Sequence, residues 1–158
     1  MAQSEISKSI RRMRSDSDDD DRATTPRDWL ARQGAAVIVP LCDQLTFASI
    51  FASSDVASPS NYLYYVLSVL KPVSLRLGDT SACLPALRLF MELDDQRIRT
   101  EDGILASSQR YLLELVKTIA PERLPGVSLG VVKGDGSYNQ FVESLPDLRA
   151  MVQAELAR

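Results

Sequence analysis

The chain has 158 residues, of which 45% are apolar, which is enough for one domain with its own hydrophobic core. Its net charge of −3 does not by itself point to nucleic acid, and it contains no histidine, the commonest general base and metal ligand. No segment approaches the roughly 20 apolar residues that cross a bilayer, so we expect no membrane partner.

The first 22 residues differ in composition from the rest. Their basic residues precede the acidic run 18–21, and their apolar residues are few and scattered. Such a segment buries too little apolar surface to offset the entropy of the chain. We therefore predict a disordered charged tail over residues 1–22 and a folded domain over residues 23–158.

Helical patterns fill the first half of this domain. Thr25-Pro26 is typical of a helix start, and Pro40 opens an apolar pattern with helical spacing. Ser58-Pro59 repeats the start signal and predicts a helix that ends before Pro72. The alternation of apolar and polar residues over 73–77 then predicts a short strand.

Two further helices are predicted downstream, one capped by Thr80 and one that ends before Pro121. Residues 127–132 are expected to be extended, residues 134–139 have the composition of a turn, and a last helix can begin between 144 and 147. Because the connections are short, the expected fold is all-α: an antiparallel four-helix bundle with a short β element and a C-terminal helix.

Few side chains in this sequence suit metal binding or catalysis. Cys42 and Cys83 are too few for a zinc site without histidine, and we expect free thiols in a reducing compartment. Carboxylates gather around one predicted loop: Asp94, Asp95, Glu101 and Asp102. Structural charge clusters are commoner than catalytic ones, so we expect no enzyme and no cofactor; a weak divalent-cation contact is a more plausible use of these carboxylates.

The most informative basic element is Asp95-x-Arg97-x-Arg99. In an extended segment the two arginines would point the same way, and two guanidinium groups on one side suit phosphate oxygens. Asp95 could hold one of them or accept a hydrogen bond from a ribose. A surface ion pair between Asp95 and an arginine is the plainer alternative.

Several short motifs follow one another along the chain. They are Thr24-Thr25-Pro26 with Trp29; Leu41-Cys42; Lys71-Pro72-Val73 with Arg76; Asp95-Gln96-Arg97-Ile98-Arg99; and Gly134-Asp135-Gly136-Ser137-Tyr138-Asn139, followed by Phe141 and Glu143-Ser144. In this order the chain resembles the coat proteins of rigid rod-shaped plant RNA viruses, the tobamovirus-like family, as a divergent member. The collinear order of the motifs carries the resemblance.

The resemblance implies a four-helix bundle packed in a helical assembly around one strand of RNA. In the family the arginines of the matching segment contact RNA phosphates, so Arg97 and Arg99 are the expected phosphate contacts. Asp95 stands at the acidic position near the ribose. Arg110 is the nearest match to an arginine that opens the family's fourth helix and faces the RNA.

The family also uses repelling carboxylate pairs between subunits as a disassembly switch. Glu101 or Asp102 follows the arginines at about the matching place, and these carboxylates could hold a divalent cation weakly. The resemblance thus implies a capsid protein whose partners are single-stranded RNA and copies of itself. It would be found in the virion and, before assembly, in the host cytoplasm.

A different class of function stays open at this point. A small helical adaptor that binds other proteins, with residues 1–22 as a disordered regulatory tail, fits the same composition. The capsid hypothesis predicts large polymers that protect RNA, whereas the adaptor hypothesis predicts a small species with low affinity for RNA.

Overall fold

The computed structural model describes residues 2–15, 21–100, 104–125, 127 and 148–158, with the side chains of all but 2, 21–25, 97–100 and 104–106. These residues form helices and turns, and no strand occurs among them, so the all-α prediction is confirmed. None of the described helices is long and apolar enough to span a membrane. The segment 128–132, most of the stretch expected to be extended, lies outside the described residues.

The predicted disordered tail is instead largely helical. Helix α1 spans Ala2–Ser15 and packs against α2, which spans Asp21–Arg32. Ile6, Ile10 and Met13 are fully or almost fully buried. Their spacing of four and three residues puts them on one face of the helix, although they are scattered among charged residues in the sequence. The disorder prediction is therefore wrong for residues 2–15, because one apolar face supplies the burial that composition alone does not reveal.

The second predicted helix is divided into short pieces. A 3₁₀ turn, η1 (Gly34–Val37), leads into α3 (Ile38–Cys42), and α4 (Phe47–Ile50) follows after a break. The hydroxyl of Thr46 accepts a hydrogen bond from the Ser49 amide at 3.1 Å and caps α4. These pieces pack on the next long helix.

Helix α5 spans Pro59–Leu77 and begins with the predicted proline, but it continues through Pro72. It ends at Gly78, whose φ of 65° is the left-handed conformation that glycine adopts without strain. The predicted strand at 73–77 is therefore wrong. A proline inside a helix costs about 3 kcal/mol. The buried face of α5 extends past the proline to Val73, and the packing of this face outweighs the lost hydrogen bond.

Helices α6 (Cys83–Thr100) and α7 (Ile104–Ile119) pack closely against each other. The last predicted helix is present as α9 (Leu148–Leu156) and packs on α6. Leu148 and Val152 of α9 are buried, as its apolar face predicts.

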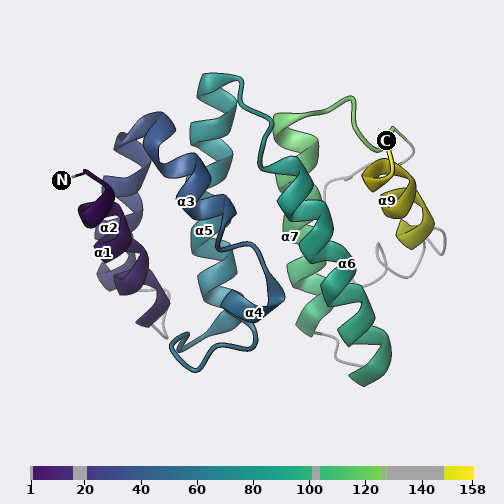
Figure 1. Cartoon of the computed structure of the whole chain (residues 1–158), viewed down its shortest axis with the longest axis horizontal. Coiled ribbons are helices and arrows are strands. Elements are labelled where there is room, and N and C mark those ends of the chain that lie inside the picture. The colour runs from purple at the N-terminus through teal and green to yellow at the C-terminus, as the bar shows by residue number, and fades with distance from the viewer. Residues whose placement is uncertain (1, 16–20, 101–103, 126, 128–147) are drawn as a thin grey trace.

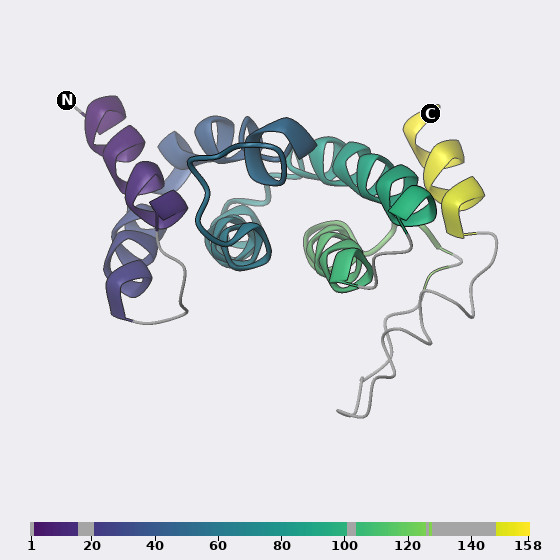
Figure 2. The same ribbon diagram turned by 90° about the horizontal axis from the view of Figure 1, so that it is seen from below.

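The described helices form an open array. From one end to the other, α1 packs on α2, α2 on α5, α5 on α7, α7 on α6 and α6 on α9 (Figure 1). Turned by 90°, α5 and α7 lie side by side and are seen nearly end-on, with α1 and α2 at one end and α9 at the other (Figure 2). The four-helix bundle is not confirmed, because each of these helices packs mainly on its neighbours in the row and not around one shared bundle axis.

Candidate nucleic-acid interface

The Asp95-x-Arg97-x-Arg99 segment lies in the last turns of α6, whose backbone is helical through Thr100. The extended geometry used to predict two parallel guanidinium groups is therefore wrong. Positions 97 and 99 are about 200° apart around the helix axis, whereas positions 95 and 99 share a face. The assignment of Arg97 and Arg99 to RNA phosphates stays a prediction, now with the two positions on opposite sides of one helix end.

Asp95 and its neighbour Asp94 are joined to the C-terminal helix by Arg149. Nη1 of Arg149 lies 2.7 Å from Oδ2 of Asp94, and its Nη2 lies 2.7 Å from Oδ1 of Asp95. The side chain of Asp94 is 6% exposed and that of Asp95 is 53% exposed. The hydrogen bonds that Arg149 donates to Asp94 and then to Asp95 raise the pKa of Arg149, which keeps the guanidinium charged.

Asp94 also ties α6 to α7. Its Oδ1 accepts a hydrogen bond from Nε2 of Gln109 at 3.1 Å, and the same nitrogen lies 3.3 Å from the carbonyl oxygen of Phe90. A buried carboxylate is costly unless it is paired and hydrogen-bonded. Asp94 meets both conditions, and it therefore stands at a junction of α6, α7 and α9. No sequence pattern links position 94 to position 149, so sequence reasoning missed Arg149.

Arg110, the other predicted RNA contact, is only 6% exposed. Its Nε lies 3.1 Å from Oε1 of Glu114, one turn further along α7. This burial argues against Arg110 as an RNA contact. An arginine followed four residues later by a glutamate is a common helix pair, and that spacing was the available signal.

A groove of about 270 Å³ lies between α5 and α7. Tyr64 and Tyr111 line it with ring centroids 5.8 Å apart, and Lys71 and Glu114 line it as well. Tyr64 is 42% exposed, although its neighbours in the sequence, Leu63 and Tyr65, are buried. The helical register turns Tyr64 away from the buried Tyr62 and Tyr65, and this spacing is the sequence signal that could have identified it.

The remaining predicted site residues, the inter-subunit carboxylates Glu101 and Asp102, lie outside the described part of the chain. The predicted turn sequence 134–139 lies outside it as well. Within the described residues, no three or more acidic or cysteine side chains cluster as a metal site. The disassembly switch and its weak divalent cation therefore stay predictions.

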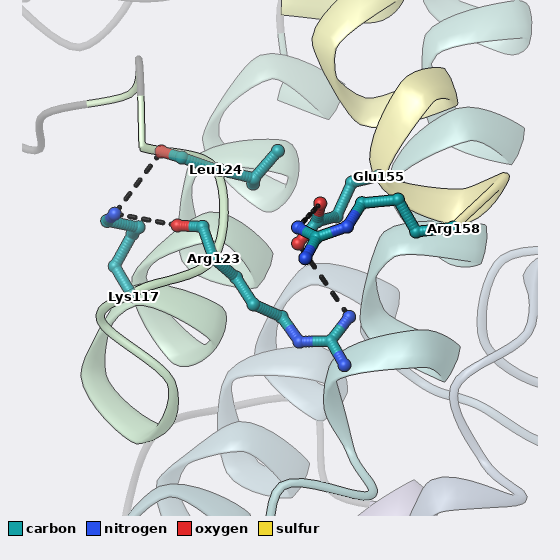
Figure 3. A network of polar contacts seen from close by, with 5 residues as sticks. All are labelled: Lys117, Arg123, Leu124, Glu155 and Arg158. Atoms are coloured by element: carbon teal, nitrogen blue, oxygen red, sulfur yellow. Dashed lines mark hydrogen bonds and ion pairs between the residues drawn. The ribbon is translucent and has the colours of Figure 1, made fainter.

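A second set of polar contacts lies at the C-terminal end of α7 (Figure 3). Nζ of Lys117 donates to the carbonyl oxygens of Arg123 at 2.8 Å and Leu124 at 3.3 Å. The side chain of Glu155 of α9 is 4% exposed. Its Oε2 lies 2.8 Å from Nη1 of Arg158, and its Oε1 lies 3.8 Å from Nη1 of Arg123. Helix α9 is thus held by ion pairs near both of its ends, at Arg149 and at Glu155.

The two cysteines are free, as predicted. Burial, followed by the nearby negative charges of Asp79 and Asp43, raises the pKa of the Cys42 thiol to about 11. Burial also raises the pKa of Cys83. Because the thiolate is the reactive form, both side chains are poor nucleophiles at neutral pH.

Comparison with models of known protein families, with curated proteins and with solved structures found no match for this chain. The resemblance to rod-virus coat proteins therefore depends on the motifs themselves.

Proposed function

We propose that this chain is a structural capsid protein that assembles into a helical rod and packages single-stranded RNA through sequence-independent phosphate contacts. The observation that carries the proposal is the position of Arg97 and Arg99. They stand in the last turns of α6 directly before α7, which packs on α6. The resemblance implies phosphate-binding arginines at this point of the chain, before the family's fourth helix.

The groove between α5 and α7 supports the same function. A protein that binds any RNA sequence combines positive charge for the backbone with aromatic rings on which bases stack. Tyr64 is 42% exposed and lies beside Tyr111 and Lys71 in this groove. Each subunit needs only a weak site for RNA, because subunits already bound to one RNA strand raise the effective concentration at which the next subunit binds. A net charge of −3 does not oppose such an arrangement.

The adaptor alternative has less support. It depended on a disordered regulatory tail, and residues 2–15 form α1 with three apolar side chains in the core. A capsid protein would occur in the virion and, before assembly, in the host cytoplasm, with single-stranded RNA and copies of itself as partners.

The first test is assembly of the purified full-length protein. An open helical polymer needs a different surface patch on each side of the subunit. We expect stacked discs or rods in negative-stain electron microscopy at mildly acidic pH, and a sedimentation coefficient that rises with protein concentration. A single small species across pH 5 to 8 at every concentration would exclude the capsid function and favour the adaptor.

The second test addresses the predicted carboxylate switch. Carboxylates of neighbouring subunits repel each other when deprotonated, so acid or divalent cations should favour assembly and alkaline pH should weaken it. We expect Glu101→Gln with Asp102→Asn to give rods that persist to higher pH than the parent in light-scattering titrations. Glu122→Gln with Glu92→Gln removes the same charge from exposed sites and serves as the control. Rods of parent and switch variant that dissociate at one pH would place the switch elsewhere.

A further inference from the structure

One cavity of the structure combines an aromatic ring, a cation and hydrogen-bond acceptors. It is the groove of about 270 Å³ between α5 and α7, which lie side by side (Figure 2). Its α5 wall carries Tyr64, Ser68 and Lys71, which are spaced by four and three residues and therefore share one face of the helix. Tyr111 and Glu114, three residues apart on α7, belong to the opposite wall. The aromatic ring and the cation thus lie one turn on either side of Ser68.

The ring of Tyr64 is placed to receive a second flat ring. It is 42% exposed, and its centroid lies 5.8 Å from that of Tyr111 at an interplanar angle of 59°, so the two rings are not stacked on each other. The groove is smaller than the roughly 300–1,000 Å³ of a pocket for a drug-sized ligand, which suits a single base. Every nucleobase has a π face that can stack on a tyrosine.

Lys71 supplies a positive charge in the same groove. Its side chain is half-buried, and it forms no hydrogen bond or ion pair within the part of the chain that the structure describes. Position 71 lies about 10 Å along the helix axis from position 64. The flexible four-carbon stem of lysine lets its ammonium group adjust to a phosphate that neighbours a base on Tyr64.

The polar groups near these two side chains are hydrogen-bond acceptors. The hydroxyl of Ser68 donates to the carbonyl oxygen of Tyr65 at 2.7 Å, so its oxygen can only accept from a ligand. Oε1 of Glu114 lies 3.1 Å from Nε of Arg110, and a carboxylate has about four lone-pair sites, so Glu114 can accept a further hydrogen bond. Acceptors select a base that offers an N–H donor. Cytosine and adenine present an amino group where uracil presents a carbonyl oxygen.

We propose that this groove is a nucleobase subsite for single-stranded RNA: a base stacks on Tyr64, the neighbouring phosphate pairs with Lys71, and the acceptors that line the groove favour a base with an amino group over uracil. This inference rests on the proposed function and deepens it, because it adds a mild base preference to phosphate contacts that are independent of sequence. The subsite takes one base per subunit, so RNA of any sequence can still be packaged.

The base preference is tested by fluorescence anisotropy with the full-length protein and labelled oligocytidylate or oligouridylate at neutral pH. The two pyrimidines have the same ring size and differ in the amino group of cytosine against the carbonyl oxygen of uracil. We expect the parent to bind oligocytidylate about twofold to tenfold more tightly, the factor for one hydrogen bond. Ser68→Ala removes one acceptor and should narrow this ratio. Equal affinity of the parent for the two oligonucleotides would overturn the proposal.

Stacking and charge are tested by separate variants over a range of salt concentrations. Tyr64→Leu keeps an apolar side chain but loses the ring, and should bind either oligonucleotide at least about fivefold more weakly; Tyr64→Phe keeps the ring and should lose less affinity. Lys71→Gln should lower the log–log salt slope by about 0.7, the value for one phosphate contact. Arg88→Gln removes one positive charge from an exposed position of α6 outside the groove and should keep the slope of the parent.

The outcomes separate the subsite from the proposed function. Circular dichroism first establishes that the variants fold as the parent does. A parent that binds no oligonucleotide at low salt refutes both the capsid function and the subsite. A parent that binds and packages RNA, with parental affinity in Tyr64→Leu or a parental salt slope in Lys71→Gln, refutes the subsite alone.

A last measurement distinguishes a base within RNA from a free nucleotide. An excess of cytidine monophosphate should not displace oligocytidylate, because the oligonucleotide is also held by contacts outside the groove, which raise the effective concentration of its bases at Tyr64. Displacement by the mononucleotide would identify a site for free nucleotides and overturn the assignment to RNA.

Discussion

Replacing Ile6 or Met13 by alanine is expected to lower the free energy of unfolding by about 2–5 kcal/mol each. Both side chains are 0% exposed, and they belong to the same core cluster as Leu30 of α2 and Tyr62 of α5. Truncation leaves a cavity that the surrounding helices fill only in part. Since domains of this size are stable by only about 5–15 kcal/mol, the double variant should be largely unfolded.

Urea unfolding followed by far-UV circular dichroism measures this loss. Glu5→Ala is the matched control, because its side chain is 57% exposed on the same helix and should change the free energy of unfolding by less than about 0.5 kcal/mol. Unfolding midpoints of the Ile6 and Met13 variants equal to that of the parent would mean that residues 1–22 behave as the disordered tail that composition suggests.

Polar contacts near the end of α1 add to its anchoring. Arg14 donates to Oε1 of Gln44 at 2.7 Å and to Oγ of Ser53 at 2.9 Å, and its guanidinium carbon lies 5.4 Å from the centre of the Tyr62 ring. The carbonyl of Arg14 accepts a hydrogen bond from the Ala57 amide at 2.9 Å. Deletion of residues 2–15 is therefore expected to impair folding of the whole chain and not merely to remove an external arm.

The double replacement Arg97→Ala with Arg99→Ala is expected to abolish RNA packaging while the protein still folds. Both positions lie in the last turn of α6, beyond its buried residues Leu93 and Asp94. Losing two phosphate contacts should lower the log–log salt slope of single-strand binding by roughly 1.4, at about 0.7 per contact. Nuclease protection of RNA in assembled particles gives the functional measurement.

A charge-matched variant makes this result specific. Arg11→Ala with Arg12→Ala removes the same two positive charges from exposed positions of α1. It should package RNA as the parent does and change the salt slope little. Equal nuclease protection by the Arg97/Arg99 variant and the parent would mean that these arginines are not the phosphate site.

Local sequence patterns were sufficient for the helices whose apolar spacing is dense. The buried face of α5 through Tyr62, Tyr65, Val66 and Val69 follows from its 3.6-residue period, and so does α9 with Leu148 and Val152. The Pro59 start of α5 was also predictable, because proline suits the first helical position. Each of these features depends on neighbours within a few turns.

Features that depend on distant partners were not predictable in this way. The apolar face of α1 is hard to recognise in the sequence because charged residues stand between its apolar residues. Pro72 predicts the end of α5, but the helix continues through it because its buried face packs on the core. The predicted site changed for the same reason, since Arg97 and Arg99 occupy a helix and Arg110 is buried.

The sequence by itself determined the all-α class and the order of the main helices. Only the tertiary structure decided that α1 belongs to the core and that Arg149 engages Asp94 and Asp95. The physical reason is range. Helix formation follows side chains three and four residues apart, whereas burial and ion pairing depend on groups that meet only when the chain has folded.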